Sequence, residues 1–419
     1  MQSPRNKKVP LQVERHVLPV TDFQTINMFY KSALVKSLFC LFLTFQPAIC
    51  FSQQHKKPSG TITRIDSLFS QFNNANSPGY AVGVFKDQKI LLAKGYGIAN
   101  LEHNIPITAN TVFNIASLSK QITAACIALL ILRDSISLED EVSKYIPGVA
   151  KYNTPVRIKH LVYFTSGIHE YHTLPRKNGL NWNMLDYFTI DTAIAASLAQ
   201  PLDFEPGTRW AYSNTDYMLL AKIVEKVSGR KLNEFAQENV FIPLAMKSTQ
   251  INDDVTAIIK DRATGYELRS EETVNVTRKA GFYLRKEGEY LQVHRNSPHY
   301  GGSGVFTSIN DWYLWDRNFY TRQMGGFPFN DLMHLRMQFG HDKKNDAFGL
   351  VFGDYKGEEM IWYAGGDIGF NSYVMRFPGQ SLTIVCFSNL GIGGNAEKMA
   401  KHVADVLIAD HVLKVKNKK

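Results

Sequence analysis

Residues 114–132 read NIASLSKQITAACIALLIL, and this stretch decides how the rest of the chain is interpreted. From Ser117 onward the residues are apolar on nearly every side of a helix, so the sequence predicts a buried helix over 117–132. Ser117 and Lys120 stand three positions apart at its start, a spacing that places two side chains on one helix face. Such a pair is either an ordinary serine beside a surface charge or a nucleophile with its base.

A serine hydroxyl becomes a nucleophile only when a base takes its proton, and a lysine is that base only if its pKa is lowered. Burial would lower the pKa of Lys120, and the free N–H groups of the helix N-terminus lie close to Ser117, where an oxyanion would form. A Ser-x-x-Lys match is expected about once by chance in a chain of this length, so the spacing alone does not decide. Ser119 points away from Lys120 and is predicted to pack or to cap.

The composition is that of a folded protein: 44% of the 419 residues are hydrophobic and 20% are charged. The formal net charge of +9 is concentrated at the two ends. Residues 1–54 hold six Lys or Arg against two acidic residues, and the tail 414–419, KVKNKK, adds four lysines. The body between them is nearly neutral and has no basic stripe that would follow phosphates, so no nucleic-acid partner is expected.

This N-terminal segment is predicted to be an extension followed by an export signal. From Met28 the chain runs MFYKSALVKSLFCLFLTFQPAIC, in which Lys31 and Lys36 precede an apolar run at 37–45. The run is too short to span a bilayer as a helix, and a buried N-terminal helix is the alternative. We therefore expect an exported protein, periplasmic or secreted, that meets a membrane only through its signal peptide. Lipidation at Cys50 is not expected, because the small residue that normally precedes a lipidated cysteine is missing.

The hydrophobic periodicity predicts strands at both ends of the remaining chain and helices in the middle. The run 78–97 has the pattern of a hairpin around the polar turn 86–89, and four short strands follow from 347 onward. Residues 130–300 are helical and rich in loops, and 396–413 carries an apolar helical face. We expect an α/β (α+β) fold in which one antiparallel sheet, closed by distant segments, is flanked by helices and carries an inserted, mainly helical lobe.

Four further stretches with recognisable motifs follow the Ser-x-x-Lys pair along the chain. One of them has Tyr212 and Asn214 after a Pro-Gly turn. Another has a glycine-rich turn that follows a predicted strand. In chain order the stretches are HLVYFTSGI (160–168), FEPGTRWAYSNTDY (204–217), FIPLAMKST (241–249) and IWYAGGDIGF (361–370).

Together with Ser117 and Lys120, these stretches resemble the serine β-lactamase and penicillin-binding-protein-like superfamily. The resemblance is to its class C-like branch of esterases, D-amino-acid peptidases and related hydrolases, which carries Ser-x-x-Lys, Tyr-x-Asn and Lys/His-x-Gly in this order. It covers roughly residues 62–410 and implies a β-lactamase/transpeptidase-like fold in one catalytic domain over 55–419. The sheet would come from about 62–115 and 300–413, and the helical lobe from about 116–300.

The resemblance also implies a role for each matched residue. Ser117 would be the acylated nucleophile and Lys120 its base or proton relay, while Tyr212 would share the proton transfer and protonate the leaving group. Asn214 would bind a substrate amide or carbonyl, and the N–H groups of Ser117 and Gly366 would form the oxyanion hole. On the residues alone, the less favoured alternatives are that Tyr212 is a buried aromatic anchor beside the helical lobe and that Asn214 is a turn or helix-capping residue.

The third motif departs from the family pattern. Tyr363-Ala364-Gly365 stands where β-lactamases have Lys-Thr-Gly or a close variant, whose cation and hydroxyl bind the carboxylate of a β-lactam or a peptide C-terminus. Tyr363 carries no charge and Ala364 offers no hydrogen bond. Losing a charge-assisted contact costs ~1.5–3 kcal/mol, roughly ten- to a hundredfold in capture, so efficient penicillin hydrolysis is not expected. Without the resemblance, Gly365 and Gly366 need only be glycines that permit a tight turn.

Other polar and aromatic residues carry less weight. Asp367, beside the glycines, either contacts substrate or caps the turn, and the aromatic run NWNMLDYF at 181–188 either lines a substrate wall or, more simply, packs. Four histidines lack metal-ligand spacing with acidic partners and are predicted to be surface or structural residues, so no metal and no cofactor is expected. These histidines are His160, His169, His172 and His294.

The leading hypothesis is an exported serine hydrolase that cleaves an ester or amide (peptide) bond through an acyl-enzyme on Ser117. Its partner would be a small-molecule ester, peptide or β-lactam-like substrate. The alternatives are a catalytically weakened penicillin-binding or sensor-type module on the same fold, and a true β-lactamase. The altered third motif favours the binding module, whereas the intact Ser117, Lys120, Tyr212 and Asn214 favour the hydrolase. The sequence does not predict an oligomeric state.

Overall fold

The computed structural model describes residues 60–73, 76–174, 187–271, 274–275, 288–339, 344–346 and 348–415. The predicted export signal and the predicted domain boundary after residue 54 lie outside these ranges, as does most of the aromatic run 181–188. Every helix within the described ranges is too short or too polar to cross a bilayer. The export signal and the boundary therefore stay predictions.

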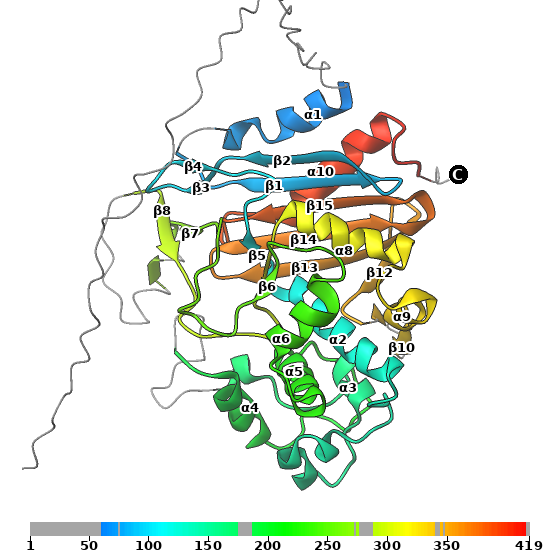
Figure 1. The fold of residues 1–419 in the computed structure, drawn as a ribbon. Helices are drawn as coiled ribbons and strands as arrows, with labels where there is room; N and C mark the ends of the chain where they lie inside the picture. The colour runs from blue at the N-terminus through cyan, green and yellow to red at the C-terminus, as the bar shows by residue number, and fades with distance from the viewer. Residues whose placement is uncertain are drawn as a thin grey trace, which may run out of the picture. The chain divides into compact units, whose positions relative to one another are not determined.

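A sheet of eight antiparallel strands is built from both ends of the chain (Figure 1). The N-terminal hairpin turns at Asp87 and Gln88, both left-handed, which is the two-residue turn that suits the twist of paired strands. Pairing of β1 with β15 brings this hairpin beside the C-terminal strands, as predicted. In sheet order the strands are β10 (Met337–Phe339), β11 (Lys344–Asp346), β12 (Val351–Tyr355), β13 (Glu358–Asp367), β14 (Phe370–Phe377), β15 (Leu382–Ser388), β1 (Tyr80–Lys86) and β2 (Lys89–Tyr96).

Helices cover both faces of this sheet (Figure 1). Alternate residues of β1 point to opposite sides: Tyr80 and Val82 join one hydrophobic core with α1 and α10, and Ala81 joins the other with α8 and the helical lobe. The helices are α1 (Gly60–Leu68), α2 (Lys120–Leu132), α3 (Ile158–Val162), α4 (Ile190–Leu198), α5 (Asn214–Ser228), α6 (Leu232–Ala236), α8 (Ile309–Thr321), α9 (Gly326–Met333) and α10 (Ala396–Ala409).

The lobe between the two parts of the sheet is mainly helical, as predicted, but it also contains short strands. β6 (Gln250–Ile251) pairs with β9 (Val305–Thr307), which also pairs with β5 (Phe113–Asn114), and β7 (Gly265–Leu268) pairs with β8 (Tyr290–Val293). Elements of two to four residues are too short for an alternating pattern to be visible in the sequence.

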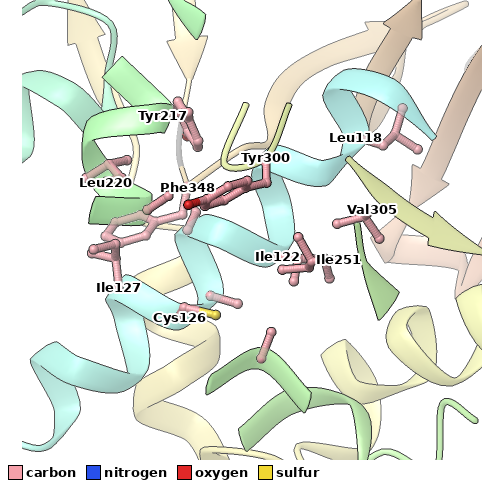
Figure 2. Close-up of a cluster of buried hydrophobic side chains, with 14 of the residues drawn as sticks. Leu118, Ile122, Cys126, Ile127, Tyr217, Leu220, Ile251, Tyr300, Val305 and Phe348 are labelled. Carbon is pink, nitrogen blue, oxygen red and sulfur yellow. The ribbon is translucent and has the colours of Figure 1, made fainter. Parts of the chain in front are cut away.

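α2 runs through the centre of the lobe. It is buried from Lys120 to Leu130, as its apolar sequence predicts. Figure 2 shows side chains of this helix, Ile122 and Ile127 among them, lying among residues of α5, β6 and β9. Burying one such aliphatic side chain contributes roughly 1.5–3 kcal/mol, so α2 is firmly held. The consequence for the site is that Lys120, at the first position of this helix, is carried into the core.

Candidate active site

Ser117 stands in a bend between β5 and α2. The chain passes through a short 3₁₀ turn, η2 (Ala116–Ser119), before α2 begins at Lys120, so the α-helix predicted from 117 starts three residues later. Ala116 has a φ of 50°, a left-handed conformation that residues with a side chain rarely adopt. Such strain persists only where neighbouring contacts hold it, and here Asn114 Oδ1 accepts the Ala116 N–H at 2.9 Å. This bend leaves Ser117 partly exposed between buried neighbours.

Lys120 lies fully buried behind Ser117. Its Nζ is 3.3 Å from Ser117 Oγ, 2.8 Å from Asn214 Oδ1 and 2.6 Å from the carbonyl oxygen of Gly302. Because all three of these oxygens are uncharged, no direct ion pair offsets the cost of burying an ammonium group. Burial therefore lowers the pKa of Lys120 to about 7. Near neutral pH a large share of the molecules carries the free amine.

Tyr212 completes the group from the opposite side. Its hydroxyl oxygen is 2.6 Å from Ser117 Oγ, and Lys120 Nζ lies 4.7 Å from the centroid of its ring. The side chain is 39% exposed, but its hydroxyl is enclosed against the serine. This burial raises the pKa of the Tyr212 phenol above its usual 10, although the Ser117 hydrogen bond opposes the rise. The phenol is thus neutral at neutral pH and is able to donate and accept a proton in turn.

Asn214 is the first residue of α5, and a carboxylate beneath it fixes its position. Ser213 caps the helix with its hydroxyl. Glu170 accepts the backbone N–H of Asn214 at 2.7 Å and that of Thr215 at 3.1 Å, where a negative charge also suits the positive end of the helix dipole. The amide oxygen of Asn214 is thereby held against Lys120. Asn214 is therefore both a helix-start residue and a member of the site.

Glu170 is a residue that the sequence interpretation missed. Its negative charge raises the pKa of Lys120 against the larger effect of burial. The His172 Nδ1 lies 3.1 Å from Glu170 Oε1 and forms an ion pair with it when protonated. Glu170 stands in the run SGIHEY, directly after a stretch that the motif comparison singles out. Only the three-dimensional packing shows that this side chain faces α5.

The loop that holds Lys120 from the other side was missed as well. The run HYGGSG at 299–304 was its available signal, because glycine-rich runs mark close backbone approaches. Gly301 has a φ of 90°, and a Cβ there would lie 2.5 Å from the carbonyl oxygen of Tyr217. The Thr123 hydroxyl donates to the Gly301 carbonyl at 2.7 Å, while Lys120 binds the next carbonyl. The loop and α2 are thus fastened together at two consecutive residues.

The third motif reaches the site along β13. β12 pairs with β13 only as far as Trp362, so the stretch from Tyr363 to Asp367 pairs with β14 alone and contacts η2. Gly366 lies on the exposed side of this stretch, and an added Cβ would meet nothing within 4 Å. A substrate is therefore free to approach its backbone. The oxyanion role of Gly366 stays a prediction.

Gly365 and Tyr363 point the other way, into the protein. A Cβ on Gly365 would lie 2.4 Å from the Ile115 carbonyl oxygen, so only glycine lets β13 come this close to the backbone before Ser117. Tyr363 is 6% exposed and belongs to the hydrophobic core, and burial raises the pKa of its phenol well above 10. No cation stands at this position, as the sequence indicates.

Asp367 is buried in an ion pair. Its two carboxylate oxygens lie 2.6 and 2.7 Å from Arg295 Nε, and one of them also accepts from Asn114 Nδ2 at 3.0 Å. It accepts the backbone N–H of Ile368 at 2.7 Å, so of the two alternatives the structure favours the turn cap. Arg295 lies in the loop after β8 and was not predicted from the sequence.

The four histidines occupy different positions. His160 Nδ1 accepts the Arg157 N–H at a helix start, and burial lowers the pKa of His160 to about 4. His169 Nδ1 lies 2.7 Å from Asp203 Oδ1, and His172 contacts Glu170. His294 lines a cavity. Across the described part of the chain, no group of three or more His, Cys, Asp or Glu is arranged to hold a metal ion.

Comparison with known proteins places this geometry in a family. The model of the Beta-lactamase family matches residues 65–408. The chain is 32% identical to penicillin-binding protein 4* of Bacillus subtilis over 194 residues, which are 45% of this chain and 41% of that protein. It is 26% identical to a D-aminopeptidase of Gluconobacter oxydans over 317 residues, 74% of this chain and 56% of that protein. The chain thus spans about half the length of these two curated relatives.

A solved structure extends the comparison to the fold. The D-amino acid amidase from Ochrobactrum anthropi, in complex with L-phenylalanine amide, superposes with a TM-score of 0.69. The superposition covers 84% of this chain and 99% of the amidase at 17% sequence identity. At this level of identity the likeness establishes the fold alone.

The chain belongs to the Beta-lactamase family. The family and the fold class predicted from the order of the motifs are therefore confirmed. The peptidase and amidase names of the relatives agree with the predicted class of serine hydrolase.

Proposed function

We propose that this protein is an exported serine hydrolase that cleaves an ester or amide bond through an acyl-enzyme on Ser117. The observation that supports the proposal most strongly is the position of the Ser117 hydroxyl. Its oxygen lies 2.6 Å from the Tyr212 hydroxyl and 3.3 Å from a lysine amine whose pKa burial has lowered to about 7. A nucleophile within reach of a base poised near neutral pH is what acyl transfer requires.

The contacts of Lys120 suit a base. As a neutral amine, Lys120 has two N–H groups and one lone pair. The N–H groups are matched by Asn214 Oδ1 and the Gly302 carbonyl, which leaves the lone pair for the proton of Ser117. Once protonated, the ammonium has three N–H groups and three oxygens to receive them. The site therefore accommodates both states of the proton transfer without rearrangement.

Acylation follows from these positions. Ser117 Oγ attacks the substrate carbonyl as Lys120 takes its proton, and the N–H groups of Ser117 and Gly366 stabilise the oxyanion. Tyr212, whose hydroxyl lies against the same serine oxygen, passes its proton to the leaving group and regains one from the protonated Lys120. A water molecule then attacks the acyl-enzyme, with Lys120 and Tyr212 moving protons in the same way, and releases the acid.

The proposed substrates are amides, peptides or esters of D-amino acids. This substrate class is supported by the names of the D-aminopeptidase and D-amino acid amidase relatives. The buried Tyr363, which offers no cation to a β-lactam carboxylate, disfavours β-lactam hydrolysis. Export is supported by the apolar run after Lys31 and Lys36.

Labelling of Ser117 tests the proposal. A fluorophosphonate probe should modify the wild-type protein and the Ser119→Ala variant, but not Ser117→Ala. Ser119 is the matched control because it is buried two residues away and its hydroxyl accepts the Val305 N–H at 2.9 Å. Labelling that persists in Ser117→Ala would contradict the proposal.

Turnover separates the hydrolase from a binding module on the same fold. With p-nitrophenyl acetate, the hydrolase releases product continuously, whereas a sensor-type protein gives one stoichiometric burst and stops. The absence of the family cation at Tyr363 is the observation that favours the sensor. Sustained turnover, and a preference for D- over L-alanine p-nitroanilide, are the expected results.

A further inference from the structure

A cavity of about 250 Å³ lies beside the turn that follows β13, where Ile368 and Phe370 form part of its lining. Its lining carries Arg262, Arg295, His294 and His299, together with the amide side chains of Asn252 and Gln292. Among the described residues that line it, none is acidic. A cavity with cationic and amide groups and no acidic lining suits an anion.

Arg262 carries the least compensated charge in this cavity. Its guanidinium stacks on the ring of Phe306, 4.9 Å from the centroid, and is half-buried. Within the described chain it has neither an ion-pair partner nor a side-chain hydrogen bond, and burial lowers the pKa of Arg262 below its usual range. A guanidinium stays charged in proteins, so a half-buried one without an acid is costly unless a ligand pairs with it.

His299 offers a second open contact. It is 3% exposed, its Nε2 is in short contact with the Tyr171 hydroxyl, and its Nδ1 is buried with no hydrogen-bond partner among the described residues. Burial and the nearby Arg295 hold the pKa of His299 well below 6.5, so the ring is neutral and has one N–H. The buried Oδ1 of Asn252, another lining residue, also lacks a partner in the described chain.

The cavity shares its wall with the candidate active site. Asp367, which holds Arg295, directly follows Gly366 on β13. Asn114, which lines the cavity and binds Asp367, also accepts the N–H of the residue before Ser117. Gly304 lines the cavity two residues after the carbonyl that holds Lys120. The cavity and the candidate active site are therefore connected through Asn114 and through the loop that holds Lys120.

We propose that this cavity binds a carboxylate group of the substrate, with the guanidinium of Arg262 as its donor. The proposal rests on the proposed function and names the substrate class more closely: an ester or amide that also bears a carboxylate. A planar guanidinium pairs with a carboxylate through two parallel hydrogen bonds.

A series of aryl esters tests the proposal. Mono-p-nitrophenyl esters of succinic, glutaric and adipic acid place a carboxylate at increasing distance from the reacting carbonyl, and their methyl-capped forms are the uncharged partners. At the chain length that reaches the cavity, kcat/KM of the acid should exceed that of its capped form by about ten- to a hundredfold. Equal values at every length would overturn the proposal.

Variants test whether Arg262 causes the preference for the acid over its methyl-capped form. Arg262→Gln should reduce the acid-to-capped ratio of kcat/KM to about one, and Arg262→Lys should keep part of it because the charge remains. Arg322 is the matched control: it is exposed and stacks on Phe327 with 3.9 Å to the ring centroid, and Arg322→Gln should leave both rates unchanged. A preference that survives in a folded Arg262→Gln protein would overturn the proposal. Thermal unfolding of each variant verifies its folding, and Arg262→Lys decides if the glutamine variant does not fold.

Free glutarate distinguishes the two possible sources of the carboxylate. Competitive inhibition of ester hydrolysis supports a substrate subsite, whereas stimulation without competition would make the cavity an effector site and overturn the assignment to substrate. If the wild-type protein hydrolyses no ester, the proposed function fails separately. Calorimetric binding of glutarate that Arg262→Gln abolishes would then still support a carboxylate site, and the lack of such binding would overturn it.

Discussion

Two buried cations, Lys120 and Arg376, show how the same fold treats a charge in opposite ways. Arg376 lies on β14 and is 3% exposed, and its Nε donates to Asp316 of α8 at 2.7 Å. Lys120 is completely buried at the start of α2, and its Nζ donates to neutral oxygens alone among the described residues. A carboxylate in direct contact offsets the desolvation of Arg376, whereas Lys120 has its nearest charged neighbours beyond hydrogen-bond distance.

The difference lies in the partners, because both cations are buried to the same degree. Arg376 has a partner that keeps it charged and joins the sheet to a helix. Lys120 has partners that accept hydrogen bonds from an amine in either state, so burial lowers its pKa to about 7. A buried cation without a carboxylate contact, next to a serine, is the physical feature that marks this site.

Removing the amine should have the largest effect. Lys120→Arg keeps a positive charge that cannot act as a base near neutral pH, and Lys120→Met removes the base outright. Because general-base catalysis typically contributes 10²–10⁴-fold, both variants should lose roughly that factor in the rate of fluorophosphonate labelling of Ser117. Arg376→Lys is the control, since a lysine beside Asp316 stays charged and lies outside the site. Near-normal labelling of either Lys120 variant would break the comparison.

The free energy of unfolding should fall more in Arg376→Met than in Lys120→Met, the opposite of the effect on labelling. Arg376→Met leaves Asp316 buried without its cation, so the free energy of unfolding should fall by about 3–5 kcal/mol. Lys120→Met leaves no orphaned carboxylate and relieves the burial of an amine. In the window between about 7 and its unfolded value of 10.5, the unfolded chain binds more protons at Lys120, so this residue makes stability rise with pH. Urea unfolding at pH 7 and pH 9 measures both effects. Equal losses in the two variants would show that the carboxylate contact is not the deciding difference.

Glu170 should have a smaller effect that sharpens the comparison. The labelling rate should rise with pH through about 7 as Lys120 loses its proton. Glu170→Gln removes a negative charge that favours protonated Lys120, so the midpoint should move to lower pH, by less than about one unit. Glu170→Asp should restore the midpoint in part. An unchanged midpoint in Glu170→Gln would contradict this prediction and would leave Glu170 only the role of holding α5.

The parts of the site that the sequence predicted are those fixed by local spacing. Ser117 and Lys120 share one turn of chain, and Tyr212 and Asn214 flank a helix cap, so short motifs were sufficient to find them. The hairpin at 78–97 and the C-terminal strands were visible for the same reason, because each carries its own periodicity. The fold class then followed from their order along the chain.

The residues that the sequence did not reveal act across long separations. Gly302 reaches Lys120 from a loop 182 positions away, and Arg295 meets Asp367 from 72 positions away. Gly302 binds through its backbone carbonyl, and Arg295 is one arginine among many. Neither residue belongs to a local sequence pattern that would mark it. Glu170 lies just after a motif stretch, but it faces a helix that only the packed lobe brings to it. Partners of this kind are set by tertiary packing, which periodicity does not describe.

The central claim is that the amine of Lys120 is deprotonated near neutral pH in the folded protein. Carbon-13 labelling of lysine permits a direct titration of the Lys120 Cε resonance, assigned by its loss in Lys120→Arg. The account predicts a midpoint close to 7. A midpoint near the ordinary lysine value of about 10.4 would contradict it, because the buried residue would then hold its proton throughout the range in which it has to act as the base.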